Sequence, residues 1–153
     1  MLARFWSECG NPNWAEQRRR FLDLLAQQAA LERMARIVGK DALPPRQQHV
    51  LLCAELINEA FLRQSAYSEI DRYCSAARQL AMMRTLNHFI DLSEAALAQR
   101  ASVEAIGQLP VMRDLRRMGE DIGDDRLEQF EELQRRLDAA ITELTRRNAA
   151  DAR

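Results

Sequence analysis

The sequence predicts an all-α fold, a helical bundle built on a long antiparallel pair of helices (an αα-hairpin) with further long and short helices. Apolar residues recur every three to four positions through long stretches, which is the period of an amphipathic helix. The 153 residues include only five glycines and four prolines, too few for a β-rich fold with its many turns. With 47% hydrophobic and 29% charged residues, the composition is that of one globular domain with its own core.

The first predicted helix starts at the Asn11-Pro12-Asn13 signal and runs from Trp14 to Gly39, a residue that suits the positive φ at a helix end. A tight turn follows, and Pro44 or Pro45 starts the second helix, which extends as far as Gln64. The apolar positions of the two helices keep the helical period: Phe21, Leu24, Leu25, Leu31, Met34 and Val38 in the first, then Val50, Ala54, Ile57 and Phe61 in the second.

A third long helix is predicted from about Ser75 to Arg100, and Ser102 caps a short helix that ends before Pro110. Another short segment around residues 111–118 is predicted to break at Gly119 and Gly123. A final amphipathic helix opens at residue 124. The domain assignment is a lead-in over residues 1–11, a helical domain over 12–148 and a frayed tail over 149–153.

Composition excludes several classes of function. A net charge of -1 gives no general attraction to nucleic acid, so no nucleic-acid partner is expected. The three cysteines form no even framework, which favours a reducing, cytoplasmic setting.

No stretch is long and apolar enough for direct membrane insertion, so any membrane association is expected through a partner. His49 and His88 lack neighbours at metal-ligand spacing, and neither a metal site nor a catalytic residue is predicted.

The most informative segment is FLRQSAYSEIDRYCS, residues 61–75, which contains both tyrosines of the chain. Tyr67 and Tyr73 lie six positions apart at a junction between two predicted helices, a spacing that lets two rings face one another across a turn. Such a pair suits a flat, apolar ligand, which gains roughly 1–3 kcal/mol per stacked ring. The alternative is that both rings fill a corner between helices, as buried tyrosines usually do.

This segment also carries a resemblance, because AYSEIDRYCS (residues 66–75) resembles the C-terminal domain of the catalytic A subunit of V/A-type rotary ATPases. The similarity continues in LERMARIVGKDALP (31–44), in the tryptophan that opens the first helix, in RQLAMMR (78–84) and in VEAIGQLPV (103–111). It covers roughly residues 12–146, and its most specific blocks are VGKDALP and AYSEIDRYCS.

The resemblance implies two sites. The family's tyrosine segment flanks the adenine ring of the nucleotide, so the residues expected at this half-site are Tyr67, Ile70, Tyr73 and Cys74. The family's hairpin turn pushes on the central rotor stalk, so the residues expected at this contact are Asp41, Ala42, Leu43, Pro44, Pro45 and Arg46. Without that context, the turn would be a solvated connection between helices.

The sequence contains no phosphate-binding loop of the form GxxxxGK[ST], and its only lysine, Lys40, follows a helix instead of preceding one. We therefore expect no cofactor bound by this chain alone and no ATPase activity in isolation. By resemblance, ATP or ADP with Mg²⁺ would bind in the complete subunit, where the nucleotide-binding part supplies the phosphate contacts.

The function that the resemblance implies is therefore that of a part of a catalytic subunit, in an enzyme that couples ATP synthesis or hydrolysis to proton or sodium transport. The expected partners are the nucleotide-binding part of the A subunit, neighbouring B subunits and the rotor stalk, in a cytoplasmic complex peripheral to the membrane. The alternative is a stand-alone, non-catalytic helical module that binds proteins through the hairpin tip or the last helix.

Overall fold

The computed structural model describes residues 11–63 and 74–151, and every regular element within these two ranges is helical, which confirms the all-α class. The elements in chain order are α2 (Trp14–Val38), the 3₁₀ turn η1 (Lys40–Ala42), α3 (Pro45–Ile57), the π turn η2 (Asn58–Leu62), α5 (Ala76–Ala98), α6 (Val103–Gly107), α7 (Val111–Asp121) and α8 (Glu128–Asp151).

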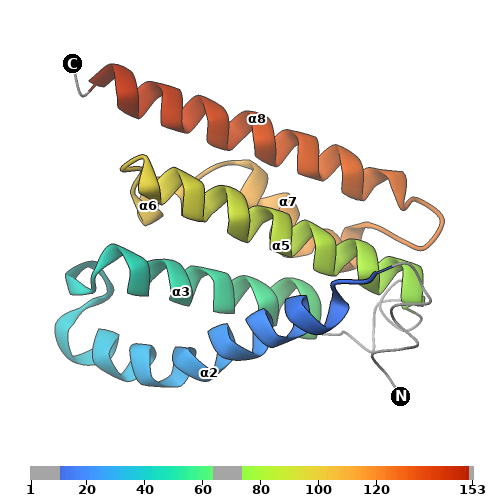
Figure 1. Cartoon of the computed structure of the whole chain (residues 1–153), viewed down its shortest axis with the longest axis horizontal. Coiled ribbons are helices and arrows are strands. Elements are labelled where there is room, and N and C mark those ends of the chain that lie inside the picture. The colour runs from blue at the N-terminus through green and yellow to red at the C-terminus, as the bar shows by residue number, and fades with distance from the viewer. Residues whose placement is uncertain (1–10, 64–73, 152–153) are drawn as a thin grey trace.

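Helices α2 and α3 pack against each other, and in Figure 1 the chain runs out along α2, turns through η1 and comes back along α3. Gly39 ends α2 with a φ of 89°, the left-handed conformation that glycine adopts without a steric cost. Pro45 is the first residue of α3, where its missing N–H leaves no helical hydrogen bond unmade. Both signals were readable in the sequence.

The second helix changes geometry before its predicted end at Gln64. Regular α-helix stops at Ile57, and the next five residues form the π turn η2, in which the Arg63 amide donates to the Asn58 carbonyl at 2.8 Å. The wider turn carries Phe61, whose ring meets that of Phe21 edge-on, with centroids 5.8 Å apart. The aromatic contact therefore ties the end of this helix to α2.

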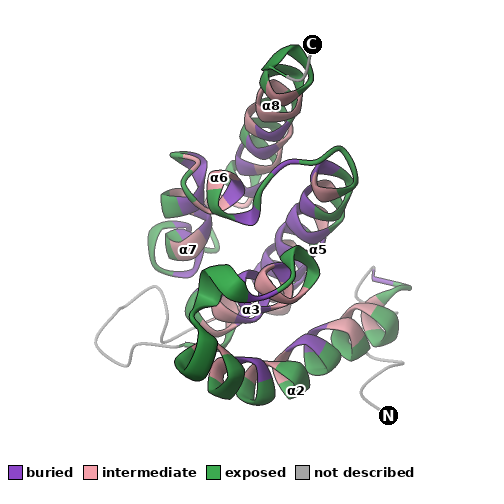
Figure 2. Ribbon diagram, turned by 90° about the vertical axis from the view of Figure 1, so that its left-hand side faces the viewer, coloured by how far each residue is buried: buried purple, intermediate pink, exposed green. Residues whose placement is uncertain are grey.

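The long helices lie in layers, with α8 along α5 and α5 along α3 (Figure 1). Buried residues gather on α3 and α5, whereas much of α2 is exposed (Figure 2). Ser75 and Ser102 cap α5 and α6 through side-chain oxygens that accept from the amides of Arg78 and Ala105, each at 3.1 Å.

Three predicted boundaries differ from the structure. Helix α7 continues through Gly119 to Asp121, so the predicted break at Gly119 was wrong. The final helix starts at Glu128 and not at Asp124, because the Asp124 carboxylate instead accepts a hydrogen bond from Ser75 Oγ at 2.8 Å. Residues 149–151, predicted as part of a frayed tail, belong to α8.

Two apolar clusters, with Val50 packed against both, hold the described helices together. The larger is contributed by α2, α3, η2, α5, α6, α7 and α8, and we call it the body core. The smaller consists of Leu31, Leu43 and Leu51 with Ala35 and Val50 packed against it, and lies where α2 turns into α3. We call this second group the tip cluster.

Candidate functional site

The turn between α2 and α3 presents most of its predicted contact residues to solvent. Asp41, Ala42, Pro44, Pro45 and Arg46 are exposed. The exception is Leu43, which is only 4% exposed because its side chain lies in the tip cluster. One buried leucine thus anchors an otherwise exposed turn, and a predicted contact residue proves to have a structural role.

Polar contacts fix the same turn to α3. The Gln48 side chain donates to the carbonyl oxygens of Asp41 and Leu43, at 3.3 and 2.8 Å. Lys40 forms an ion pair with Glu55 at 2.7 Å. These contacts bind the backbone of the turn as well as a side chain, and so they fasten the turn to α3 at the end of two packed helices.

Of the four residues predicted for the adenine half-site, Tyr67, Ile70 and Tyr73 lie outside the described residues. Cys74 is described and is half-buried, with its Sγ atom 3.8 Å from the Ser75 carbonyl oxygen. The structure therefore shows how the chain enters and leaves this segment, through η2 on one side and the start of α5 on the other.

Both of these ends are fastened to α7 and the turn after it. The Cα of Gly119 approaches the end of the second helix so closely that an added Cβ would lie 2.9 Å from the Ala60 carbonyl oxygen. On the other side, the buried Arg78 guanidinium donates to the Gly119 carbonyl. Sequence reasoning missed this arrangement because its partners lie 41 and more positions apart.

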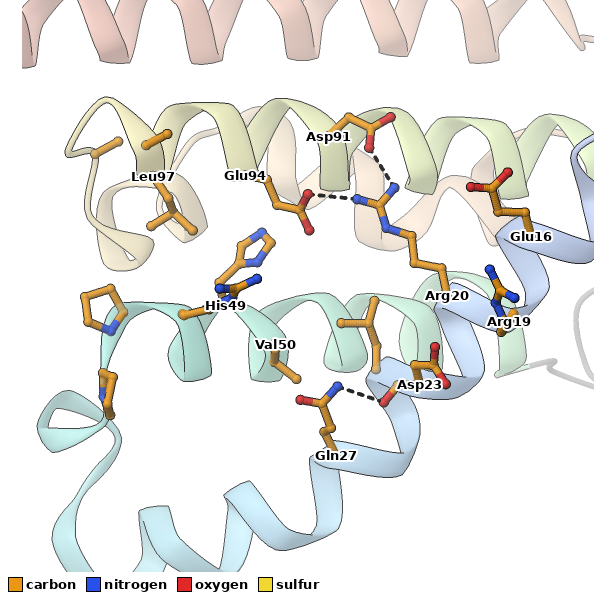
Figure 3. A pocket seen from close by; sticks show the side chains of 16 residues that line it. Glu16, Arg19, Arg20, Asp23, Gln27, His49, Val50, Asp91, Glu94 and Leu97 are labelled. Carbon is orange, nitrogen blue, oxygen red and sulfur yellow. Dashed lines mark hydrogen bonds and ion pairs between the residues drawn. The ribbon is translucent and has the colours of Figure 1, made fainter.

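A further feature that the sequence did not reveal is an open groove of about 1200 Å³ between α2, the start of α3 and the end of α5 (Figure 3). Arg20 crosses it from α2 and binds two carboxylates on α5, Asp91 at 2.6 Å and Glu94 at 3.0 Å. Burial on its own lowers the pKa of Arg20, but the hydrogen bonds and charges of these carboxylates outweigh burial and raise it above its ordinary value. Arg20 therefore joins the α2–α3 pair to α5.

His49 faces this groove from α3 (Figure 3), but most of its ring is covered and it is only 4% exposed. Its Nε2 lies 2.7 Å from Ser93 Oγ, and the Ser93 hydroxyl donates to the Ile90 carbonyl at 3.0 Å. The imidazole must then donate from Nε2 to Ser93, which assigns the tautomer. Burial is the main cause that lowers the pKa of His49, so the ring is neutral.

Cys53 lies 3.3 Å from His49 Nε2, a pairing that in other settings activates a thiol. Here burial raises the pKa of the Cys53 thiol to about 12, so the nucleophilic thiolate does not form at neutral pH. Within residues 11–63 and 74–151 no group of His, Cys, Asp and Glu side chains is arranged to hold a metal ion. The His49 cluster is therefore a polar part of the core.

Comparison with known proteins assigns the family. The model of the C-terminal domain of V and A type ATP synthase matches residues 4–107. The chain belongs to this family.

Relatives in the V/A-type ATP synthase family extend the match. The A subunit of the A-type ATP synthase of Pyrococcus abyssi is 37% identical over 137 residues, which cover 84% of this chain and 14% of the relative. The same-named protein of Methanopyrus kandleri is 32% identical over 143 residues, covering 94% of this chain and 24% of the relative. The chain therefore spans well under a third of the length of these relatives.

None of the helices in the described part of this V/A-type domain combines the length and the apolar content that crossing a membrane requires. The family model ends at Gly107, the last residue of α6, so α7 and α8 lie beyond it. Those two helices nonetheless complete the body core, and α7 holds both ends of the tyrosine segment.

Proposed function

We propose that this chain works as part of the catalytic subunit of a V/A-type rotary ATPase, in which ATP synthesis or hydrolysis is coupled to proton or sodium transport. The main support for the proposal is that a chain of this family has an exposed turn between α2 and α3 that is fixed at the end of these two packed helices. In such an enzyme the turn transmits force to a moving partner, and a turn that bent on contact would transmit little.

In this proposal, Asp41 to Arg46 form the part that touches the rotor stalk, as a lever. Leu43 anchors the turn from within, while the exposed residues on either side of it meet the stalk. The ion pair of Arg20 with Asp91 and Glu94 supports this role, because it passes a movement of the α2–α3 pair on to α5.

The second part of the proposal assigns Tyr67, Ile70, Tyr73 and Cys74 to the adenine side of a nucleotide site. Support comes from the two ends of this segment, which α7 holds through Ala60 and Arg78. Phosphate and Mg²⁺ contacts belong, in this proposal, to the nucleotide-binding part of the subunit, since the present sequence has no phosphate-binding loop. The half-site therefore contributes to ATP affinity only in the assembled enzyme.

The assembled enzyme would place this domain beside the nucleotide-binding part of its own subunit, neighbouring B subunits and the stalk. Its location would be cytoplasmic and peripheral to the membrane, through those partners.

The test replaces Tyr67 and Tyr73 by alanine, one at a time, in the complete subunit within its complex. Loss of one stacked ring is expected to raise the KM for ATP about tenfold, with a smaller change in kcat. Tyr→Phe at each position is the matched control, because phenylalanine keeps the stacking face and loses only the hydroxyl. An unchanged KM in both alanine variants would refute the adenine assignment.

A second measurement separates this proposal from a stand-alone interaction module. It is the intact mass of the native polypeptide that contains residues 66–75, isolated from its source cell. A mass several times 17.6 kDa is expected for a polypeptide that also carries the nucleotide-binding part. A mass near 17.6 kDa would refute attachment to that part and favour the module.

A further inference from the structure

His49 is the first buried residue of α3, and it lies where the body core ends and the open groove begins. The residues of α3 before it, Pro45 to Gln48, are exposed or half-buried. Leu52 and Cys53, a few positions further on, belong to the body core. Figure 3 shows the imidazole at the wall of the groove, between α3 and α5. A titratable side chain therefore occupies the joint between the α2–α3 pair and the rest of the bundle.

The neutral ring of His49 is held by one short hydrogen bond. Its Nε2–H donates to Ser93 Oγ on α5 at 2.7 Å, and the Ser93 hydroxyl donates in turn to the Ile90 carbonyl. Nδ1 then carries no proton, and its one hydrogen-bonding contact among the described residues is a long one, with Cys53 Sγ at 4.0 Å. The site therefore fits the neutral ring and offers little to a second N–H.

Protonation would put a positive charge and a new Nδ1–H donor into this buried site. The new donor would face only the Cys53 sulfur, which is a weak acceptor. That thiol cannot form an ion pair with the imidazolium, because burial raises its pKa to about 12 and keeps it uncharged. A buried charge and an unsatisfied donor both cost free energy. The charged ring is therefore favoured only where water reaches it.

The charged groups around the groove do not offset this cost. Those that line it are Glu16, Arg19, Arg20 and Asp23 on α2, Arg46 on α3, and Asp91 and Glu94 on α5. The charged residues of α6 and η2, which also pack against α3, are Glu104 and Glu59, and neither lines the groove. Burial is the largest influence on the pKa of His49 and lowers it. The charge of Glu94 raises this pKa, and that of Arg20, which binds Glu94, lowers it.

We propose that His49 is an acid-sensitive clasp between α3 and α5. At neutral pH the ring bonds to Ser93 and closes the joint. In mild acid the ring takes a proton from solvent when the start of α3 moves off α5 and water enters, so the open form gains in population. The groove gives this movement room, because it already separates α2 and the first turn of α3 from the end of α5.

The direction of the pH dependence follows from the two states of the ring. In the open form the ring is hydrated and has its ordinary pKa of 6.5, whereas in the closed form its pKa is lower. The closed form therefore has its full stability above pH 6.5. Below that value the equilibrium constant for opening is expected to rise by up to about tenfold per pH unit, until the closed ring is protonated as well.

The reaction of Cys53 with dithiodipyridine measures this opening, because thiols react with that disulfide in acid as well as at neutral pH. Cys53 is 1% exposed, so its thiol reacts only when the joint opens. The rate in the folded chain, divided by the rate in the urea-unfolded chain at the same pH, gives the opening constant. Peptide masses identify Cys53 among the three cysteines. From about pH 7 to about pH 5 the wild-type constant is expected to rise about tenfold or more.

Variants of both histidines of the chain show which one is responsible. His49→Gln keeps a donor for Ser93 but does not titrate, so its opening constant is expected to stay flat over the same range. His49→Leu, which is apolar and of similar size, is expected to be flat as well. His88→Gln is the matched control, because His88 pairs with Asp138 on α8 and does not line the groove. This control is expected to keep the wild-type pH dependence.

Each outcome supports or overturns the clasp. A pH dependence that survives in both His49 variants, or that disappears in His88→Gln, would overturn it. Urea denaturation at each pH gives the constant for global unfolding, which the opening constant at Cys53 is expected to exceed by about tenfold or more. Equal constants would also overturn the clasp, because Cys53 would then react only when the whole bundle unfolds.

Discussion

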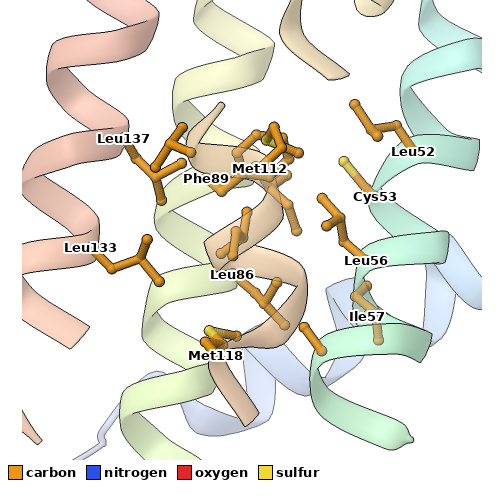
Figure 4. Packing of buried hydrophobic residues seen from close by; sticks show 14 of the residues in the cluster. Leu52, Cys53, Leu56, Ile57, Leu86, Phe89, Met112, Met118, Leu133 and Leu137 are labelled. Carbon is orange, nitrogen blue, oxygen red and sulfur yellow. The ribbon is translucent and has the colours of Figure 1, made fainter. Parts of the chain in front are cut away.

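The body core and the tip cluster differ in how many elements build them and in what lies around them. Side chains from α3, α5, α7 and α8 meet in the body core (Figure 4), and several of them, such as Phe89, Met118 and Leu137, are fully buried. The tip cluster has only Leu31, Leu43 and Leu51 at its centre, and the residues on both sides of Leu43 along the chain are exposed. The body core thus sets the stability of the bundle. The tip cluster holds the turn between α2 and α3 in a place that is open to solvent.

The largest effect is expected from Phe89→Ala in the body core. Phe89 is 0% exposed, so the substitution leaves a cavity that surrounding helices fill only in part. The free energy of unfolding is expected to fall by about 3–5 kcal/mol. Urea denaturation checks this value, and a loss below about 1 kcal/mol would mean that the core can collapse around the missing ring.

Leu43→Ala tests the tip in the same way and should cost less. The expected loss is about 2 kcal/mol, because the cluster is small and close to solvent. The comparison is sharper in native-state hydrogen exchange, where amides of the turn should exchange faster and those of α5 should exchange only through global unfolding. Equal acceleration in both regions would show that tip and body form one cooperative unit.

Alkaline pH probes the body core through the buried thiol of Cys53. Its thiol pKa is about 12 in the folded chain against an ordinary 9, so between these values the unfolded state loses a proton that the folded state keeps. Stability from this group is complete below pH 9 and is expected to fall by about 1.4 kcal/mol per pH unit above it. Cys53→Ala should lose that part of the slope, and a slope equal to wild type would contradict the burial argument.

The smallest effect is expected from Lys40→Ala at the tip. Lys40 and Glu55 form a solvent-exposed pair, with 63% and 31% of their side chains exposed. Such pairs contribute about 0–1 kcal/mol, so Tm should change little while hydrogen exchange in the turn rises slightly. Glu55→Gln is the reciprocal control, and a large loss in either variant would show that the pair does more than restrain the turn.

Local signals made much of the tip predictable. Gly39, Pro45 and the Ser102 cap of α6 act through their own backbone or their nearest neighbours. Gly39 and Ser102 stand where the sequence placed them, and Pro45 is one of the two prolines predicted to start α3. The two sites themselves remain predictions, because the structure gives the shape of the turn and the ends of the tyrosine segment but no partner.

Contacts between distant parts of the chain were not predictable. Glycine weakens helices in general, which predicts a break at Gly119, but here the residue allows the close approach to Ala60. Asp124 has a cap-like sequence position but binds Ser75, 49 residues away. The burial of His49 and the ion pair of Arg20 likewise depend on α5 lying beside α2 and α3, which no local pattern specifies.

The π turn at residues 58–62 gives the chain a place where its length can change. A hydrogen bond from Arg63 to Asn58 encloses one residue more than an α-helical turn does. Deleting one residue here would restore ordinary α-helix without altering the register of α3 against α2. The residues after the deletion would keep nearly the same orientation, because the π turn accommodates one extra residue within the helix. This turn can therefore absorb the loss of one residue while the hairpin before it and the start of the chain after it stay in place.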